Sequence, residues 1–277
     1  MTISVHTNKA ALTALQNLNK TNDELGDVQN RINTGLKIAN AKDNAAVWAI
    51  AQGQRADIGA LGAVKMSLER ANSIAEVSLT AGETISDLLV QLKEKVVAAM
   101  DTSLDTASRT ALDSDYKAIL RQITQVVQNA SFDGANLFSG SGGNIQFLAN
   151  AEATSRLTLS TRTLALGGSN ISIPPTSSIS TKTLASTALG QLTSSITKVN
   201  QALGNLGSQA KQLDAHLEFV NKLTDVLDAG VGNLVDADLA KESARLQALQ
   251  VQQQLGAQAL SIANSAPQIV LQLFQGG

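Results

Sequence analysis

The 277-residue chain has no cysteine, which excludes disulfide bonds and thiol chemistry. It has only three prolines, the residue that most disfavours a helix interior, so long uninterrupted helices are possible. Aromatic residues make up only 3% of the sequence, although globular enzymes draw much of their buried area from large rings. Hydrophobic residues nevertheless reach 43%. This combination favours helices packed through slim seams of Ala, Leu, Ile and Val.

Several functional signals are also missing. No apolar run reaches the ~18 residues that a membrane span requires, and the charges, with a net value of −2, form no basic patch for nucleic acid. The first 20 residues lack the apolar block and cleavage site of a secretory signal peptide, so we expect export, if it occurs, by another route. His6 and His216 lie in separate segments, without a pattern of metal ligands or catalytic groups. We therefore predict no metal, no cofactor and no enzymatic activity.

What the chain does contain is a long apolar repeat between Leu189 and Leu234. Apolar residues recur there at alternating steps of three and four, interrupted only by Thr224. Such a repeat places one narrow hydrophobic stripe on a helix, and other helices must cover it. The pattern predicts an elongated antiparallel coiled-coil bundle, a rod of mainly α structure. The repeat continues past Gly230 and Gly232, where we expect the helix to end.

Four more segments have helical periodicity: Asn8–Asn33, Ile58–Ala99, Leu112–Ala130 and Leu239–Ile262. In the second of them the apolar register shifts near Gly82, which motivates the hypothesis that this seam has two alternative packings. Thr34–Asp43 reads as an irregular connector, and Asp101–Ser108 as a turn. Pro267 is expected to kink or end the last helix.

The middle of the chain, at about residues 131–186, differs from the rest. Short alternating runs around Ile145, Leu157 and Ile171 predict strands, and the Ser/Thr-rich run up to Thr187 reads as exposed loop. Hydroxyl groups in this run are either sites of O-glycosylation or a merely soluble loop, and the sequence does not separate these two interpretations. The segment is a small insert that contains a β-hairpin, too short to be a second large domain.

Two distant motifs resemble one known family. Asn33–Ala46, which reads NTGLKIANAKDNAA, closely resembles the segment that joins the first two helices of bacterial flagellins. Asp236–Ala240 and Ala263–Leu271 resemble the C-terminal flagellin helix. The resemblance covers roughly residues 1–150 and 185–275, in the order that flagellins have.

This resemblance implies a structural subunit that polymerises into the flagellar filament for swimming motility. It implies that residues 1–40 and 235–277 pair as the inner domain, and that residues 41–234, with the insert, form a surrounding rod domain. The expected partners are further copies of the chain, other flagellins, hook and cap proteins, the flagellar export machinery and a secretion chaperone at the C-terminus. The expected location is extracellular, without a cleavable signal peptide.

The expected assembly interface lies on the two terminal helices and the apolar C-terminal end. Chain ends are normally polar, so an apolar end requires a covering surface. Contacts that do not close into a ring produce a helical filament. The residues assigned to this interface are Leu15, Leu18, Asn22, Leu25, Ile32, Leu246, Leu249, Leu255, Ile262, Ile269, Val270, Leu273 and Phe274. For Asn22, selection of register and simple partial solvation are both open interpretations.

Two other functions compete with this one. A hook-filament junction protein resembles flagellins at its ends, although the motif at Asn40–Asp43 and the compact insert favour a flagellin. An intracellular coiled-coil scaffold is the alternative from another class, and it would need no apolar C-terminus.

Flagellins that activate the animal innate receptor carry an Arg-x-Arg-Glu pattern on the second long helix, whereas this chain has Gln91–Glu94 there. We therefore expect recognition by that receptor to be impaired.

Overall fold

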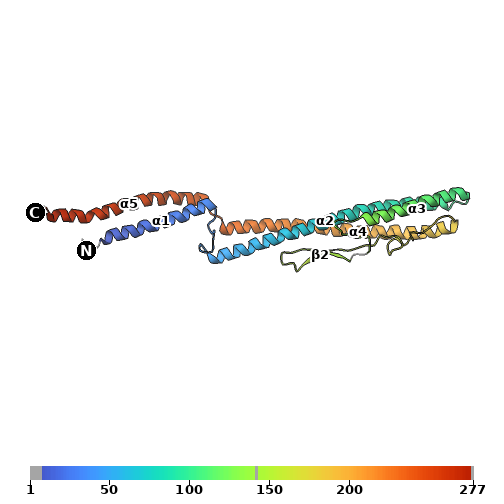
Figure 1. Cartoon of the computed structure of the whole chain (residues 1–277), viewed down its shortest axis with the longest axis horizontal. Coiled ribbons are helices and arrows are strands. Elements are labelled where there is room, and N and C mark those ends of the chain that lie inside the picture. Colours follow the sequence, from blue (N-terminus) through green and yellow to red (C-terminus); the bar gives the residue numbers. More distant parts are fainter. Residues whose placement is uncertain (1–7, 141–142, 276–277) are drawn as a thin grey trace. The chain divides into compact units, whose positions relative to one another are not determined.

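The computed structural model describes residues 8–140 and 143–275, with the backbone alone for 266–275 (Figure 1). His6 lies outside the described residues. The described parts form five helices and one two-stranded sheet, which confirms the mainly α fold with a β-hairpin. In chain order the elements are α1 (Lys9–Thr34), α2 (Ala45–Ala99), α3 (Thr106–Asn129), β1 (Ile145–Leu148), β2 (Arg156–Leu159), α4 (Lys182–Val235) and α5 (Leu239–Gln275).

The chain divides into two compact units. One unit comprises Met1–Ala56 with Val226–Gly277, and the other comprises Asp57–Asp225. We call the second unit the bundle, and we call α1 with α5, which belong to the first, the terminal pair. The long helices α2 and α4 contribute residues to both units.

The buried seam of α2 runs without a shift of register from Leu61 to Ala99. Its members follow alternating steps of three and four, and they are Leu61, Val64, Leu68, Ala71, Ala75, Ser78, Gly82, Ile85, Leu89, Leu92, Val96 and Ala99. The displacement expected near Gly82 is therefore wrong. Ser78 and Gly82 occupy seam positions without being hydrophobic, so the apolar pattern alone suggested a break. The hypothesis of two alternative packings loses the observation that motivated it.

Helix α4 runs antiparallel to α2 in the bundle. Asn72 donates a hydrogen bond to Asp214 at 2.6 Å, and Ser86 donates one to Asn200 at 3.2 Å, so a higher number on one helix meets a lower one on the other. The buried residues of α4 recur every seventh position at Leu192, Val199, Leu206, Leu213 and Val220. This confirms the coiled-coil repeat that the sequence predicted for this helix.

Both predicted ends of α4 need correction. The helix begins at Lys182, inside the Ser/Thr-rich run, because the Thr181 hydroxyl accepts a hydrogen bond from the Leu184 N–H at 3.3 Å and caps the first turn. It continues through Gly230 and Gly232 to Val235. Val231 and Val235 are buried, so packing holds the last turns although glycine disfavours a helix.

Helix α3 returns along α2 after a short turn. Asp105 caps it by accepting a hydrogen bond from the Ser108 N–H at 2.9 Å, so the turn ends earlier than the expected Ser108. The predicted end near Asn129 is confirmed. Across the two helices, Lys95 Nζ lies 2.8 Å from the Asp115 carboxylate. Tyr116, Leu120 and Ile123 are fully buried and join α3 to the bundle core.

The insert is anchored on the bundle by hydrogen bonds at its backbone. Strands β1 and β2 pair antiparallel with Ile145 opposite Leu159. The Leu148 N–H donates to the Ser67 hydroxyl on α2 at 3.2 Å, and the Ala149 carbonyl lies 2.7 Å from His216 Nε2 on α4. The expected strand at Ile171 and Ile173 is wrong: Ile171 makes only an isolated bridge to Leu166, and the Ser172 N–H donates to Ser195 of α4.

Candidate assembly interface

Helices α1 and α5 lie side by side and antiparallel (Figure 1). Four polar contacts across the pair show this direction, because the contacted residue of α5 generally falls in number as that of α1 rises. Asn8 Nδ2 donates to the Ala263 carbonyl at 2.6 Å, and Gln253 Nε2 donates to Asn22 Oδ1 at 2.8 Å. Two ion pairs, Glu24 with Arg245 and Arg31 with Glu242, each span 3.5 Å.

The connectors at one end of the pair are joined to each other. Leu36, between α1 and α2, forms an antiparallel bridge with Asp236, between α4 and α5. The Ala237 N–H donates to the Gly35 carbonyl at 2.8 Å, and the Lys37 N–H donates to the Val235 carbonyl at 2.6 Å. Gly35 has φ 71°, a left-handed conformation that glycine adopts without strain. These bonds hold the start of α5 beside the end of α1.

At the other end, Asn8 compensates for a proline inside α5. Pro267 has no N–H, so it cannot donate to the carbonyl four residues earlier, at Ala263. Asn8 Nδ2 donates to that carbonyl instead, while Asn8 Oδ1 accepts from the Ala11 N–H at 3.0 Å and caps α1. The helix continues to Gln275, so Pro267 does not end it, and of the two expected effects only a kink remains as a prediction. The Asn8 side chain thus caps α1 and supplies the hydrogen-bond donor that the Ala263 carbonyl of α5 lacks.

The terminal pair leaves much of its apolar surface uncovered. Only Val28 and Leu249 are fully buried among its described apolar side chains, at 1% and 4% exposure. Leu12 and Leu15 of α1 are 53% and 43% exposed, and Val251, Leu255 and Ile262 of α5 are 55%, 59% and 70% exposed. Large apolar side chains in such number at one site indicate an interaction surface.

A groove of about 650 Å³ lies along the junction of the two helices. Its α1 side includes Ala10, Ala14 and Leu18, and its α5 side includes Gly256, Ala259 and Ala263. A Cβ atom on Gly256 would lie 3.3 Å from Leu18 Cδ1, so the helices approach closely there. Small side chains line most of this groove, which leaves room for larger side chains of another molecule.

The electrostatics of the pair centre on Glu242, which is only 8% exposed. One carboxylate oxygen faces Arg31, and the other, Oε2, has no hydrogen-bond partner among the described residues. A buried carboxylate is stable only while its counter-charge is present. Arg31 is therefore a structural partner of α5.

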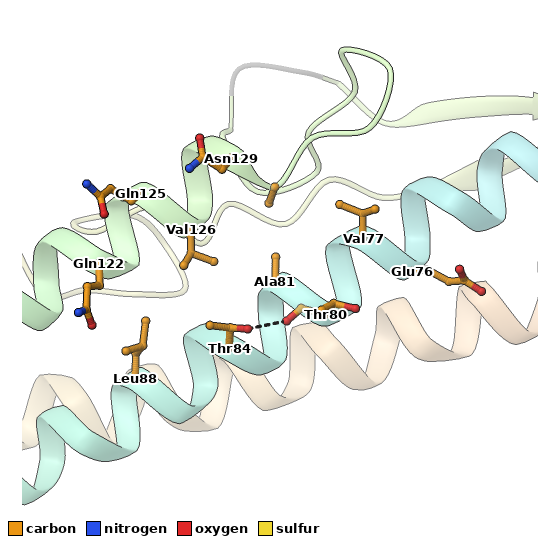
Figure 2. A pocket seen from close by; sticks show the side chains of 11 residues that line it. Glu76, Val77, Thr80, Ala81, Thr84, Leu88, Gln122, Gln125, Val126 and Asn129 are labelled. Carbon is orange, nitrogen blue, oxygen red and sulfur yellow. Dashed lines mark hydrogen bonds between the residues drawn. The ribbon is translucent and has the colours of Figure 1, made fainter.

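A second groove, of about 760 Å³, lies in the bundle between α2 and α3. Figure 2 shows Val126 of α3 and Ala81 and Leu88 of α2 pointing into the gap between the helices. Glu76 is the one ionisable residue of its lining, so the groove offers no acid–base pair or activated nucleophile.

Within residues 8–140 and 143–275, no three His, Cys, Asp or Glu side chains gather as metal ligands. None of the described helices has the length and hydropathy to cross a bilayer.

Asp113 of α3 is a buried carboxyl group with a structural role in the bundle. Asp113 accepts hydrogen bonds from the Ser178 hydroxyl and the Ile179 N–H, each at 2.7 Å, and its other oxygen lies 2.7 Å from Lys117 Nζ. Desolvation raises the pKa of Asp113, but these donors outweigh it and hold the pKa below its ordinary value. Next to it, burial raises the pKa of the Tyr116 hydroxyl. Both residues fix the end of the insert to α3.

The comparisons with known proteins agree along the whole chain. Residues 5–142 match the model of the bacterial flagellin N-terminal helical region, and residues 189–274 match that of the C-terminal helical region. Flagellin FljJ of Caulobacter vibrioides is 52% identical over 280 aligned residues, which cover 100% of both chains. The chain belongs to the bacterial flagellin family. It is a structural subunit of the extracellular flagellar filament, which forms by self-polymerisation and serves motility.

One more distant flagellin and one solved structure extend the comparison. A flagellin of Brucella melitensis is 38% identical over 99% of each chain. The structure of a putative flagellar hook-associated protein from Vibrio parahaemolyticus superposes with a TM-score of 0.59 at 12% identity, over 70% of this chain and 100% of that one. At this identity the likeness shows the fold alone.

The residues that the sequence assigned to the interface fall into three groups in this flagellin. Leu18, Leu25, Ile32, Leu246 and Leu249 are buried or half-buried. Leu15, Asn22, Leu255 and Ile262 are exposed, and Asn22 also bonds across the pair to Gln253. The side chains of Ile269, Val270, Leu273 and Phe274 lie outside the described residues, although their backbone belongs to α5.

Other surface residues were missed. Leu12 and Val251 are exposed apolar residues of the pair, and a systematic search for leucines and valines off the predicted seam would have found them. Asn8 was recognised only as a helix start. The absent N–H of Pro267 was the available signal that Ala263 requires another donor.

Proposed function

We propose that this flagellin polymerises through its terminal pair, with residues 1–40 and 235–277 as the inner domain of the filament and residues 41–234 around it. The supporting observation is the contrast within α1 and α5: Val28 and Leu249 are buried by the pairing, while Leu15, Leu255 and Ile262 stay exposed. A single copy thus aligns the two helices and leaves a second apolar surface for its neighbours. Contact between different patches of successive copies produces a helical filament when the rotation between copies does not close a ring.

The interface includes the thirteen residues assigned from the sequence. Leu18, Leu25, Ile32, Leu246 and Leu249 act by pairing the helices, whereas Leu15, Asn22, Leu255 and Ile262 face neighbouring copies. Ile269, Val270, Leu273 and Phe274 are assigned to the same interface from their apolar character in the sequence. The function is mechanical and requires no catalytic group.

Further partners follow from the same assignment. Other flagellins that share the terminal motifs can join the polymer, and hook and cap proteins meet its two ends. Before assembly, the export machinery handles the chain, and a secretion chaperone covers the apolar C-terminal end. The likeness to a hook-associated protein does not favour a junction role, because it is a likeness of fold at 12% identity.

Seeded polymerisation tests this proposal. Purified monomer is mixed with short filament seeds and followed by light scattering and negative-stain microscopy, beside a truncation that ends at Ala266. We expect the full chain to elongate the seeds and the truncation to remain monomeric. The matched control, Val97→Ser, changes a 52% exposed apolar residue of the bundle and should polymerise normally.

Two results would contradict the proposal. One is a full-length chain that stays monomeric with fresh seeds. The other is a truncation that elongates at the rate of the full chain. Far-UV circular dichroism of each variant confirms that the helices are still formed.

A further inference from the structure

The free end of the terminal pair, away from the connectors, is distinguished by its lack of charge. Residues 10–19 and 246–277 contain no Asp, Glu, Lys, Arg or His. Both ion pairs of the terminal pair, Glu24 with Arg245 and Arg31 with Glu242, lie outside these stretches. We call residues 10–19 with 246–265 the charge-free half. Interface centres are depleted of charged residues because burying an unpaired charge is costly, so this half is suited to burial by another chain.

The exposed leucines of α1 form a ridge in the charge-free half. Leu12 and Leu15 are three positions apart and therefore lie on one face of the helix. We call them the leucine ridge. The described part of the same chain leaves about half of each side chain uncovered, since they are 53% and 43% exposed.

The groove of about 650 Å³ lies on the other side of α1. Residues two positions apart on a helix point in directions about 200° apart. The groove is lined by Ala10 and Ala14, two positions on either side of Leu12, and by Thr13 and Asn17, two positions on either side of Leu15. One copy therefore carries ridge and groove on opposite faces, and its own ridge does not fill its own groove.

We propose that the leucine ridge of one copy inserts into the α1–α5 groove of the next copy. This inference rests on the proposed polymerisation through the terminal pair and specifies which surfaces meet. Large side chains on one surface match small ones on the other, as in the packing of helix ridges into grooves. Because ridge and groove are different patches on opposite faces, each copy can bind two neighbours, and an assembly whose rotation does not close a ring stays open at both ends.

The absence of native cysteine allows a direct test by cross-linking. The double variant carries Leu15→Cys on the ridge and Ala259→Cys in the groove, and the two single variants are its controls. Each is polymerised under reducing conditions on seeds, oxidised mildly, and analysed by non-reducing gel electrophoresis and mass spectrometry of the joined peptides. A dilute monomeric sample of the double variant controls for bonds within one chain.

We expect the polymerised double variant to give a ladder of trimers and longer chains, joined only between positions 15 and 259. An equal mixture of the two single variants should give dimers, and each single variant alone should give none. A normal polymer of the double variant without a ladder would overturn the ridge-and-groove contact. So would dimers from the Leu15→Cys variant alone, because they would place ridge against ridge.

Filling the groove gives an independent readout. Ala14→Leu and Ala259→Leu should each reduce the elongation rate at least tenfold, and the control Val97→Ser, at an exposed residue of the bundle, should not. If unaltered monomer elongates seeds and groove-filled monomer does so equally well, this inference is wrong while the proposed function stands. If unaltered monomer fails to elongate, the proposed function itself fails.

Discussion

The bundle and the terminal pair are built from similar helices but complete their cores differently. In the bundle, α2, α3 and α4 cover one another's seams, and Leu68, Leu92 and Leu192 are fully buried within one chain. In the terminal pair only two helices meet, so Leu12, Leu255 and Ile262 remain more than half exposed. A single partner helix covers only part of a wide apolar face, so the rest of that face stays exposed in a pair of helices. The number of covering helices thus separates a self-sufficient fold from an assembly surface.

The largest predicted difference comes from one substitution made in both regions. Leu206→Ala in the bundle removes a side chain that is 2% exposed, so it should lower the free energy of unfolding by about 2–5 kcal/mol. Leu255→Ala, at a residue 59% exposed, should change monomer stability by less than about 0.5 kcal/mol and raise the critical concentration for polymerisation. Urea unfolding of the monomer and sedimentation of the polymer measure the two effects. Equal losses of monomer stability would contradict the comparison.

A smaller effect tests the tightness of the bundle at Gly82. A Cβ atom there would lie 2.2 Å from Leu203 Cδ2, so Gly82→Ala should destabilise the chain by about 1–3 kcal/mol in urea unfolding. The control Gly62→Ala, in the same helix and with no atom within 4 Å, should stabilise it by up to about 1 kcal/mol. A neutral Gly82→Ala would indicate that α2 and α4 do not pack closely at this level.

The pH dependence of the bundle follows from Asp113. Because its pKa is lower in the folded chain, ionised Asp113 contributes stability that is present above the ordinary Asp pKa of about 4 and is lost as the pH falls through the folded value. Asp113→Asn should lower the unfolding free energy at pH 7 by about 1–2 kcal/mol and weaken its acid dependence. The exposed neighbour Asp115 provides the control, since Asp115→Asn should have little effect. If the unfolding free energy of Asp113→Asn fell with pH as steeply as that of the unaltered chain, Asp113 would not be the source of this acid dependence.

The smallest effect concerns the ion pairs of the terminal pair. Arg31→Met leaves the buried Glu242 carboxylate without its cation and should destabilise the pairing by about 1 kcal/mol, less than for a fully buried pair because Arg31 is 32% exposed. Arg245→Met breaks a more exposed pair with Glu24 and should cost no more than about 0.5 kcal/mol. Thermal melts of the monomer at low salt compare the two. If Arg245→Met destabilised the monomer more than Arg31→Met, the charge of Glu242 would have to be balanced by a group other than Arg31.

Most of the fold was predictable because the apolar residues of each helix recur with the helical period in the sequence. The 3.5-residue repeat indicated the buried face of α4, and Asp101–Ser108 was predicted as the turn before α3, although the helix begins earlier than expected. The failures are residues whose role is defined by a distant partner. Gly82 belongs to the seam only because Leu203 fills the space beside it, and α5 passes Pro267 where Asn8 supplies the missing donor.

The candidate interface was predictable as a region and only partly as a surface. Apolar periodicity identifies the faces of α1 and α5 that are hydrophobic, but it does not say which of two apolar faces the pairing covers. Leu249 and Leu255 belong to one predicted set, yet they are 4% and 59% exposed. This difference in exposure depends on the register of α1 against α5. That register is set at Asn8, at Asn22 and at the joined connectors, by contacts between residues that are far apart in sequence.

Hydrogen–deuterium exchange of backbone amides in monomer and in polymer tests the central claim most directly. If the terminal pair is completed only by other copies, the amides of α1 and α5 exchange faster in the monomer than those of the buried stretches of α2 and α4, and they become protected on polymerisation. The bundle amides should be protected equally in both states. Amides of α1 and α5 that are as protected in the monomer as in the polymer would contradict the account.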